Sequence, residues 1–140
     1  MSRHPLNLLF RFLLEVAGLV AMGRWGWHLA PGWGGAALAV GVPAVGAAAW
    51  GVFRVQNDGG RPVVEVPGPV RLALEAAFFG AAVWLAARTG SGSWARPLGL
   101  AVLVHYAASW DRVALLARNR PLPAGGPKAA PGLGDSPPDR

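Results

Sequence analysis

The chain has 140 residues, of which 53% are hydrophobic, 14% are charged and none is cysteine. Soluble domains carry roughly 25% charged residues, so this composition excludes an ordinary soluble domain and a disordered chain. The lack of cysteine excludes disulfides, thiolate metal sites and cysteine nucleophiles. A net charge of +6 would suggest a nucleic-acid partner in a soluble protein, but in a membrane protein it first reports topology, and we expect no nucleic acid.

The first half of the chain predicts two membrane-spanning helices. The first covers about residues 6–29 and lacks the small-residue cleavage site of a secretory signal, so we expect it to be retained. It ends at Pro-Gly-Trp-Gly-Gly, residues 31–35, because proline and consecutive glycines favour a reversal. The second covers about residues 36–55. Residues 29–53 contain no ionisable side chain, and this run exceeds the roughly 20 residues that cross a bilayer.

The second half predicts a loop, two further helices and a tail. In chain order these are a polar loop at 56–69, a helix at about 69–89, a Gly-Ser turn at 90–93 and a helix at about 94–118. Pro69 suits the first turn of a helix, which needs no backbone donor. Residues 119–140 contain prolines and glycines without apolar periodicity, and we expect a disordered cytoplasmic tail.

A soluble four-helix bundle is the alternative to a membrane fold. A soluble surface helix needs a continuous polar stripe, but residues 76–87 and 97–110 offer only His105, Tyr106 and Ser109 as polar positions. We therefore predict an all-α fold in which residues 1–118 form an integral membrane bundle of four transmembrane helices.

An internal repeat relates the two halves of this bundle. Shifting the chain by 60 residues aligns scarce residue types as well as alanines. The most informative matches are Arg11 with Arg71, Glu15 with Glu75 and Trp50 with Trp110. Charged residues inside apolar helices are rare, so the repeat predicts two tandem helical hairpins. Because a hairpin returns to its starting side, the two should be parallel and related by a pseudo-two-fold axis along the membrane normal.

The arginines predict the orientation. One side of the bundle is rich in basic residues: Arg3, Arg11, Arg54, Arg61, Arg71, Arg112, Arg118, Arg120, Lys128 and Arg140. The other side has only Arg24, Arg88 and Arg96. By the positive-inside rule, both termini and the central loop are cytoplasmic, in the cell membrane. The outer interface would then hold four aromatic anchors, which are Trp25, Trp27, Trp33 and Trp94, while Trp50 and Trp110 lie toward the inner one.

Two Arg-x-x-x-Glu units are the strongest functional signal. The spacing of four places Arg11 and Glu15 on one helix face, and likewise Arg71 and Glu75. A charge at the centre of a membrane helix costs about 2.5–3.5 kcal/mol, so these side chains must face each other, the interior or water. One interpretation is a clamp between the hairpins, in which Glu15 meets Arg71 and Glu75 meets Arg11. The other is a path for an ion or a small solute.

The fourth helix adds a polar stripe. His105, Ser109 and Arg112 share one face, with Asp111 at its edge. A histidine near the midplane can relay protons, or it can simply hydrogen-bond a neighbouring helix. With Asp111, the acids Glu15 and Glu75 balance the three arginines, so the cluster suits mutual pairing better than capture of a charged ligand.

The second helix carries a small-residue ridge at every fourth position: Ala39, Pro43, Ala47 and Gly51. Small residues let helices approach closely, so we interpret the ridge as a packing surface. The glycines of residues 32–35 lack the strand and the Lys-Ser/Thr of a phosphate-binding loop. The three histidines are too far apart to predict a metal site. We expect no cofactor and no enzymatic activity.

Four segments of the chain carry a resemblance to a known family: Asn7-Leu-Leu-Phe-Arg-Phe-Leu-Leu-Glu15, Gly23-Arg-Trp-Gly-Trp27, Arg71-Leu-Ala-Leu-Glu75 and His105-Tyr-Ala-Ala-Ser-Trp-Asp-Arg112. Together they resemble the YrdB-like family of small bacterial membrane proteins. The resemblance covers about residues 6–118. It implies a four-helix multi-pass protein of uncharacterised biochemical role, and it supplies no catalytic residue.

The sequence leaves two functions open. The first is a structural or interaction component of the cell membrane, whose partners are the lipid bilayer and either a second copy of the chain or another membrane protein. The alternative is a minimal transporter or channel that moves a proton or small solute past Glu15, Glu75 and His105, as a homo-oligomer, because four helices pack closed around their own side chains.

Overall fold

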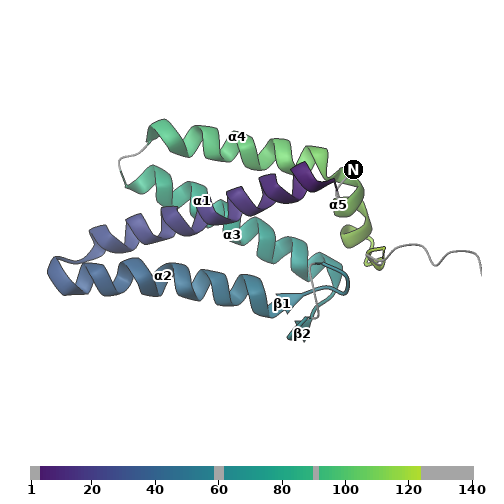
Figure 1. Cartoon of the computed structure of the whole chain (residues 1–140), viewed down its shortest axis with the longest axis horizontal. Coiled ribbons are helices and arrows are strands. Elements are labelled where there is room, and N and C mark those ends of the chain that lie inside the picture. The colour runs from purple at the N-terminus through teal and green to yellow at the C-terminus, as the bar shows by residue number, and fades with distance from the viewer. Residues whose placement is uncertain (1–3, 59–61, 90–91, 124–140) are drawn as a thin grey trace, which may run out of the picture.

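A computed structural model of the chain, shown in Figure 1, describes residues 4–58, 62–89 and 92–123. Its elements, in chain order, are α1 (Pro5–Leu29), α2 (Gly32–Val52), β1 (Phe53–Arg54), β2 (Val64–Glu65), α3 (Gly68–Arg88), α4 (Gly92–Ala108) and α5 (Trp110–Ala117). The fold is all-helical apart from the two short strands, which pair in parallel. The expectation of disorder in residues 124–140 lies outside the described residues.

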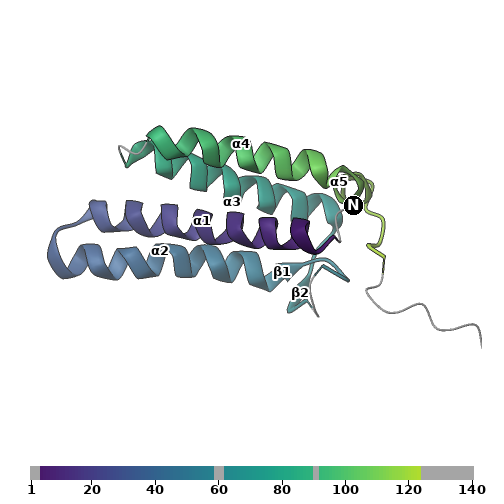
Figure 2. The same cartoon turned by 45° about the horizontal axis from the view of Figure 1, so that its top comes forward.

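The four long helices form two hairpins, α1 with α2 and α3 with α4 (Figure 1). Both hairpins turn at the same end of the bundle, and Figure 2 shows the N-terminus, the strands and α5 gathered at the other end. Helix α1 contacts α2, α3 and α4, whereas α2 lies outermost and contacts mainly α1. Residues from the two halves of the sequence therefore meet where α1 lies against α3.

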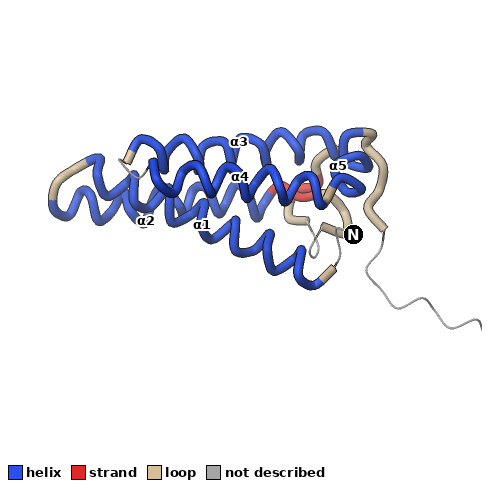
Figure 3. Tube along the Cα trace, turned by 90° about the horizontal axis from the view of Figure 1, so that it is seen from above, coloured by secondary structure: helices blue, strands red, loops and turns tan. Residues whose placement is uncertain are grey.

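The first hairpin is tight at its turn because of its glycines. Gly32 adopts a φ of +59°, which glycine reaches without steric cost. A side chain at Gly26 would overlap the carbonyl oxygen of Leu38, and one at Gly23 would lie 3.0 Å from that of Ala39. The backbones of α1 and α2 are thus in close contact near the turn. Toward the N-terminus of α1 the two helices separate, as Figures 1 and 3 show.

The loop between the hairpins differs from the sequence prediction. Helix α2 begins at Gly32, four residues earlier than predicted, and ends at Val52, because the next two residues pair with Val64 and Glu65. Two asparagines, Asn57 and Asn119, join the loop and the start of α3 to the chain after α5. Both have a positive φ, a backbone conformation that asparagine tolerates better than most residues. Asn57 donates to the carbonyl oxygen of Leu122, and Asn119 accepts from the amide of Gly68, both at 2.9 Å.

The fourth helix is not continuous, which corrects the prediction of one helix at 94–118. It breaks at Ser109, and α5 leaves α4 at an angle of 74°. The bend places α5 over the start of α3, where Leu116 is 1% exposed and its backbone lies against Gly68. The chain after α5 also packs here, since Leu122 is buried with Val55 and Leu116. Residues 119–123 are therefore ordered, in contrast to the predicted disorder from residue 119.

The distribution of side chains differs from that of a soluble bundle. The interior holds an apolar cluster around Phe78, Phe79 and Ala82, together with five buried polar side chains. These five are Arg71, Glu75, His105, Ser109 and Arg112. By contrast, many large apolar side chains are exposed on every long helix. Helix α2 is the extreme case, since Gly35 is its one buried residue in the described part of the chain.

Candidate functional site

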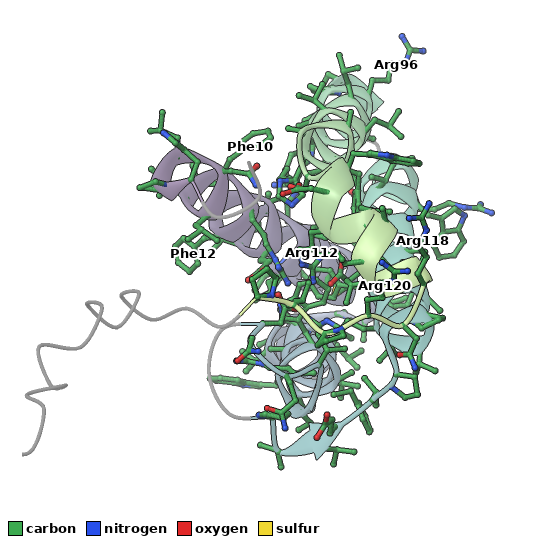
Figure 4. All side chains as sticks on the ribbon, turned by 90° about the vertical axis from the view of Figure 1, so that its right-hand side faces the viewer. Phe10, Phe12, Arg96, Arg112, Arg118 and Arg120 are labelled. Carbon is green, nitrogen blue, oxygen red and sulfur yellow. The ribbon has the colours of Figure 1, made fainter. Side chains whose placement is uncertain are left out.

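Six charged side chains meet at the end of the bundle that carries the N-terminus and α5. We call them the charge cluster: Arg11 and Glu15 from α1, Asp58 from the loop before β2, Arg71 and Glu75 from α3, and Arg112 from α5. They come from segments spread over the whole chain, and the break at Ser109 turns Arg112 toward the middle of the bundle, as Figure 4 shows. The cluster contains three acids and three bases and is formally neutral.

Glu75 lies at the centre of the charge cluster and is 1% exposed. Its carboxylate accepts from Arg71 Nε at 3.1 Å and from both Nη atoms of Arg112, at 2.9 and 2.5 Å. The hydroxyl of Tyr106 donates to it at 2.9 Å, and Arg11 Nη2 lies 3.6 Å away. A buried carboxylate is tolerated only when its lone pairs are satisfied, and here two arginines and a tyrosine satisfy them.

Asp58 is the second centre of the charge cluster. It accepts from Arg11 Nη1 at 3.1 Å, from Arg112 Nε at 3.2 Å and from Arg112 Nη2 at 2.7 Å. Arg71 Nε lies 3.6 Å away. Burial by itself would raise the pKa of Asp58, but the charge of Arg11 and the hydrogen bonds from Arg112 outweigh it and lower the pKa well below the usual value. Asp58 is therefore a carboxylate at neutral pH.

Arg71 connects the charge cluster to the end of α2. Its Nη1 donates to the carbonyl oxygens of Trp50, at 2.8 Å, and Phe53. Its guanidinium carbon lies 4.2 Å from the centre of the Trp50 ring, a cation–π distance. The last carbonyls of a helix lack intrahelical partners and carry partial negative charge, so Arg71 caps α2 while Nε binds the acids.

The predicted clamp between the hairpins forms in part. Arg11 lies near Glu75, as predicted, but Arg71 pairs with Glu75 and Asp58 rather than with Glu15. Glu15 is bound by Arg11 on its own helix, at 3.1 Å. The reason is that Asp58, which the sequence interpretation assigned to an ordinary polar loop, reaches into the bundle and binds three arginines.

The structure places Asp111 outside the charge cluster, which corrects the sequence interpretation. Asp111 is exposed on α5, because the bend at Ser109 turns its side of the helix away from the interior. Asp58 takes its place as the third acid. One signal was available in the sequence: three arginines inside apolar helices require three acids nearby, and Asp58 follows the second helix closely.

His105 and Ser109 lie beside the charge cluster on α4 and at the break. Ser109 accepts a hydrogen bond from the side-chain amide of Asn7 at 2.9 Å, so it joins α1 to the break. His105 is 4% exposed, and its ring lies edge-on to Phe10 with 6.0 Å between ring centres. Its Nδ1 atom is buried and has no hydrogen-bond partner in the described part of the chain.

A cavity of about 220 Å³ opens beside the charge cluster. Its walls come from the first half of α1, the end of α2, β1, the loop and α3. It lies where α1 and α2 separate. Within residues 4–58, 62–89 and 92–123, neither this cavity nor any other place groups three His, Asp or Glu side chains that could hold a metal ion.

The predicted small-residue ridge of α2 packs against α1 at only two of its four positions. Ala39 and Pro43 face α1 at Gly23, whereas Ala47 is exposed and Gly51 lies near Arg54. The inward face of α2 instead uses Val42, Gly46 and Trp50, because α2 packs on both α1 and α3 at that end.

The four predicted aromatic anchors differ in exposure. Trp27 and Trp33 are exposed, whereas Trp25 and Trp94 are half-buried against the core.

Comparison with known proteins identifies the family. A family described as "Protein of unknown function (DUF2568)" matches residues 9–105. "Uncharacterized protein YrdB" of Bacillus subtilis (strain 168) is 32% identical over 114 residues, which cover 76% of this chain and 89% of that protein. No solved structure matches. The matched family region contains five members of the charge cluster and ends before Arg112. The chain therefore belongs to the YrdB-like DUF2568 family, whose function is unknown.

Proposed function

We propose that the protein is a four-span component of the cell (cytoplasmic) membrane with a structural or interaction role. One observation carries the membrane placement: the bundle buries a cluster of charges while large apolar side chains stay exposed on its surface. Arg71 and Glu75 are each 1% exposed, whereas Val40 and Val45 of α2 are 71% and 72% exposed. In water this arrangement would leave large apolar patches uncovered, but in a bilayer lipid covers them.

The helices have the dimensions of membrane spans. Three of them, α1, α2 and α3, are long and apolar enough to cross a bilayer, and a fourth span results if α4 and α5 are taken together. Helix α4 has 17 residues, about 26 Å at 1.5 Å per residue, close to the ~30 Å hydrocarbon core. Helix α5 then lies across the membrane surface, with Trp110 exposed and Leu116 buried.

The two hairpins are proposed to be tandem repeats with both termini in the cytoplasm. In each first helix the same pair forms with the same geometry, since Nε to Oε1 is 3.1 Å for Arg11–Glu15 and for Arg71–Glu75. The end with the N-terminus and α5 also holds Arg54, Arg118 and Arg120, which favours the cytoplasm for that end.

Cysteine labelling tests this topology, because the natural chain has no cysteine. A single cysteine at Trp33, 92% exposed in the α1–α2 turn, should react with an impermeant maleimide in intact cells. A single cysteine at Arg120 should react only after the cells are opened. The reverse pattern would contradict the orientation, and recovery of the protein in the soluble fraction would contradict the membrane placement.

The charge cluster supports a structural role over transport. Its three acids and three bases bind each other at hydrogen-bond distances, so no member is left as an uncompensated charge that a passing ion would have to neutralise. Removing one charged side chain of the cluster should therefore destabilise the bundle, and should not change the flow of an ion or solute across the membrane. The family carries no enzymatic name, and we propose a non-enzymatic role.

The least covered helix, α2, is the proposed surface for a partner in the membrane, either a second copy of the chain or another membrane protein. It lies at the edge of the bundle and exposes Val40, Val45 and small residues on one side. Small residues permit close helix–helix packing in lipid. Gly41 has open space where a side chain would point, so a helix can approach there.

A proton or small-solute transporter is the second candidate, favoured by the buried Nδ1 of His105, which has no hydrogen-bond partner among the residues that the structure describes. Purified protein in liposomes with a pH gradient separates the two functions. A structural protein produces no flux, and Glu15→Gln lowers its stability. A flux in the natural protein that vanishes in Glu15→Gln and in His105→Gln would establish transport instead.

A further inference from the structure

Glu15 is the member of the charge cluster whose carboxylate the protein satisfies least. Its Oε1 accepts a hydrogen bond from Arg11 Nε at 3.1 Å, whereas its Oε2 accepts none within the part of the chain that the structure describes. Glu75 and Asp58, by contrast, each accept hydrogen bonds through both oxygens. A carboxylate has about four lone-pair sites, and its charge is costly to bury when they are left empty. The remaining sites of Glu15 therefore need a donor that the described residues do not supply.

The open part of Glu15 lies at the cavity beside the charge cluster. Its side chain is 24% exposed, against 2% for Glu75, and it contributes to the wall of that cavity. At about 220 Å³, the cavity has many times the roughly 10–15 Å³ that a single water needs, and a water needs polar partners as well as space. Other charged side chains in the wall, among them Asp58 and Arg71, supply such partners. The cavity therefore meets both conditions for holding water.

Water suits the cavity better than an anion or a lipid chain does. All three side-chain nitrogens of Arg11 already face carboxylates, at 3.1 Å for Nε and Nη1 and at 3.6 Å for Nη2. Arg71 is 1% exposed. These two arginines are therefore bound by the protein and do not recruit an anion. A lipid chain would leave Oε2 of Glu15 without a donor, which is costly for a charged group, whereas water donates to it.

The cavity lies toward one end of the bundle and is closed toward the other. It is found where α1 and α2 separate near the N-terminus of α1 (Figure 1), and its walls include Arg54 of β1 and Asp58 of the loop. Irregular backbone at membrane depth is tolerated where it lines a water-filled cavity. Trp50 bounds the inner side, with its ring centre 4.9 Å from that of Phe78 and 5.6 Å from that of Phe79. Both phenylalanines belong to the apolar core, so water stops at Trp50.

We propose that this cavity is a water-filled vestibule, open to the cytoplasm and closed at Trp50, which hydrates Glu15 inside the membrane. The proposal rests on the membrane placement and orientation proposed above, which put the N-terminal end of α1 on the cytoplasmic side. Charged side chains within membrane spans face the bundle interior or a water-filled cavity. Water in the vestibule lets Glu15 exchange protons with the cytoplasm, whereas the closed inner end keeps water from crossing the bundle. Glu15 is therefore reached from one side only.

Single cysteines in the full chain test the vestibule, with a methanethiosulfonate reagent that carries a trimethylammonium group and does not cross membranes. In inside-out membrane vesicles, Glu15→Cys should react about tenfold faster than Leu13→Cys or more, because the reacting form is the thiolate, which needs water to form. Leu13 is the matched control, since it is 53% exposed but does not line the cavity. It also lies about 3 Å nearer the N-terminal end of α1, so depth alone would favour its reaction. In intact cells, Glu15→Cys should stay unmodified.

Two further variants keep the test independent of a damaged fold and locate the closed end. Phe12 also contributes to the cavity wall, and Phe12→Cys keeps every charge of the cluster, so it should react as Glu15→Cys does. Leu19→Cys, one turn beyond Glu15 and packed against the apolar core, should not react. The proposal is overturned if neither Glu15→Cys nor Phe12→Cys reacts faster than Leu13→Cys. Fast reaction of Leu19→Cys, or of Glu15→Cys in intact cells, would overturn it as well. If Leu13→Cys reacts as fast as the others, the surface of α1 is in water and the membrane placement itself is wrong.

Discussion

Arg112 and Asp58 are joined by two hydrogen bonds, 3.2 Å from Nε to Oδ1 and 2.7 Å from Nη2 to Oδ2, although 54 positions separate them in the sequence. Arg112 reaches Asp58 because the fourth helix breaks at Ser109. The same guanidinium also binds Glu75. One arginine on α5 thus ties the central loop to α3 and closes the end of the bundle.

Asp58→Asn should destabilise the protein by about 3 kcal/mol, the range for breaking a buried ion pair. The side chain of Asp58 is 7% exposed and binds Arg11 and Arg112, which would be left without this carboxylate. Thermal unfolding in detergent measures the loss. Glu65→Gln is the control, since Glu65 is exposed and its carboxylate accepts a hydrogen bond from Gln56, and it should stay within about 0.5 kcal/mol. Equal stability of the two variants would contradict the role of Asp58.

The contribution of Asp58 should depend on pH. Its pKa is lowered in the folded protein, so its stabilisation is fully present above the unfolded value of about 3.9 and is lost as the pH falls through the folded pKa. The gap in melting temperature between the natural protein and Asp58→Asn should therefore be constant from pH 7 to about pH 5 and narrow below about pH 4. If the gap in melting temperature narrowed between pH 7 and pH 5, the pKa of Asp58 in the folded protein would be raised rather than lowered, and the prediction would be wrong.

Gly68→Ala should destabilise the protein by about 1–3 kcal/mol, the usual cost of overpacking. The added methyl group would overlap the carbonyl oxygen of Leu116 and lie 2.8 Å from its Cα, so α5 would have to move off the start of α3. Thermal unfolding again measures the effect. Gly80→Ala on the same helix meets no atom within 4 Å and should be neutral or slightly stabilising. If both variants behaved alike, the contact between α3 and α5 would be refuted.

A cysteine at Val45 should crosslink in native membranes to a partner at the exposed face of α2. Val45 is 72% exposed on the least covered helix, and the chain has no other cysteine. Leu100→Cys is the control, because Leu100 is 64% exposed but lies on α4. Gel mobility distinguishes a second copy from a different protein. Crosslinking at Leu100 alone would move the proposed partner surface to α4.

The order of the helices and their turns followed from local patterns in the sequence. Long apolar runs and Pro31-Gly32 are signals that act within a few residues, and α1, α2 and α3 lie close to the predicted ranges. Arg11 with Glu15 and Arg71 with Glu75 pair as their spacing of four predicts, because that contact also lies within one helix.

Only the tertiary structure decided which acids the arginines bind. The break at Ser109 has no proline or glycine to mark it, and it arises where Arg112 and Leu116 find partners on α3 and the loop. The same bend explains why Asp58 replaces Asp111 in the charge cluster, since it brings Arg112 to Asp58 and leaves Asp111 exposed on α5. The sequence alone determined that a few charges must be paired inside an apolar bundle, since unpaired charges there are too costly. The choice of partner depends on distances between segments far apart in the chain, and no local spacing encodes those distances.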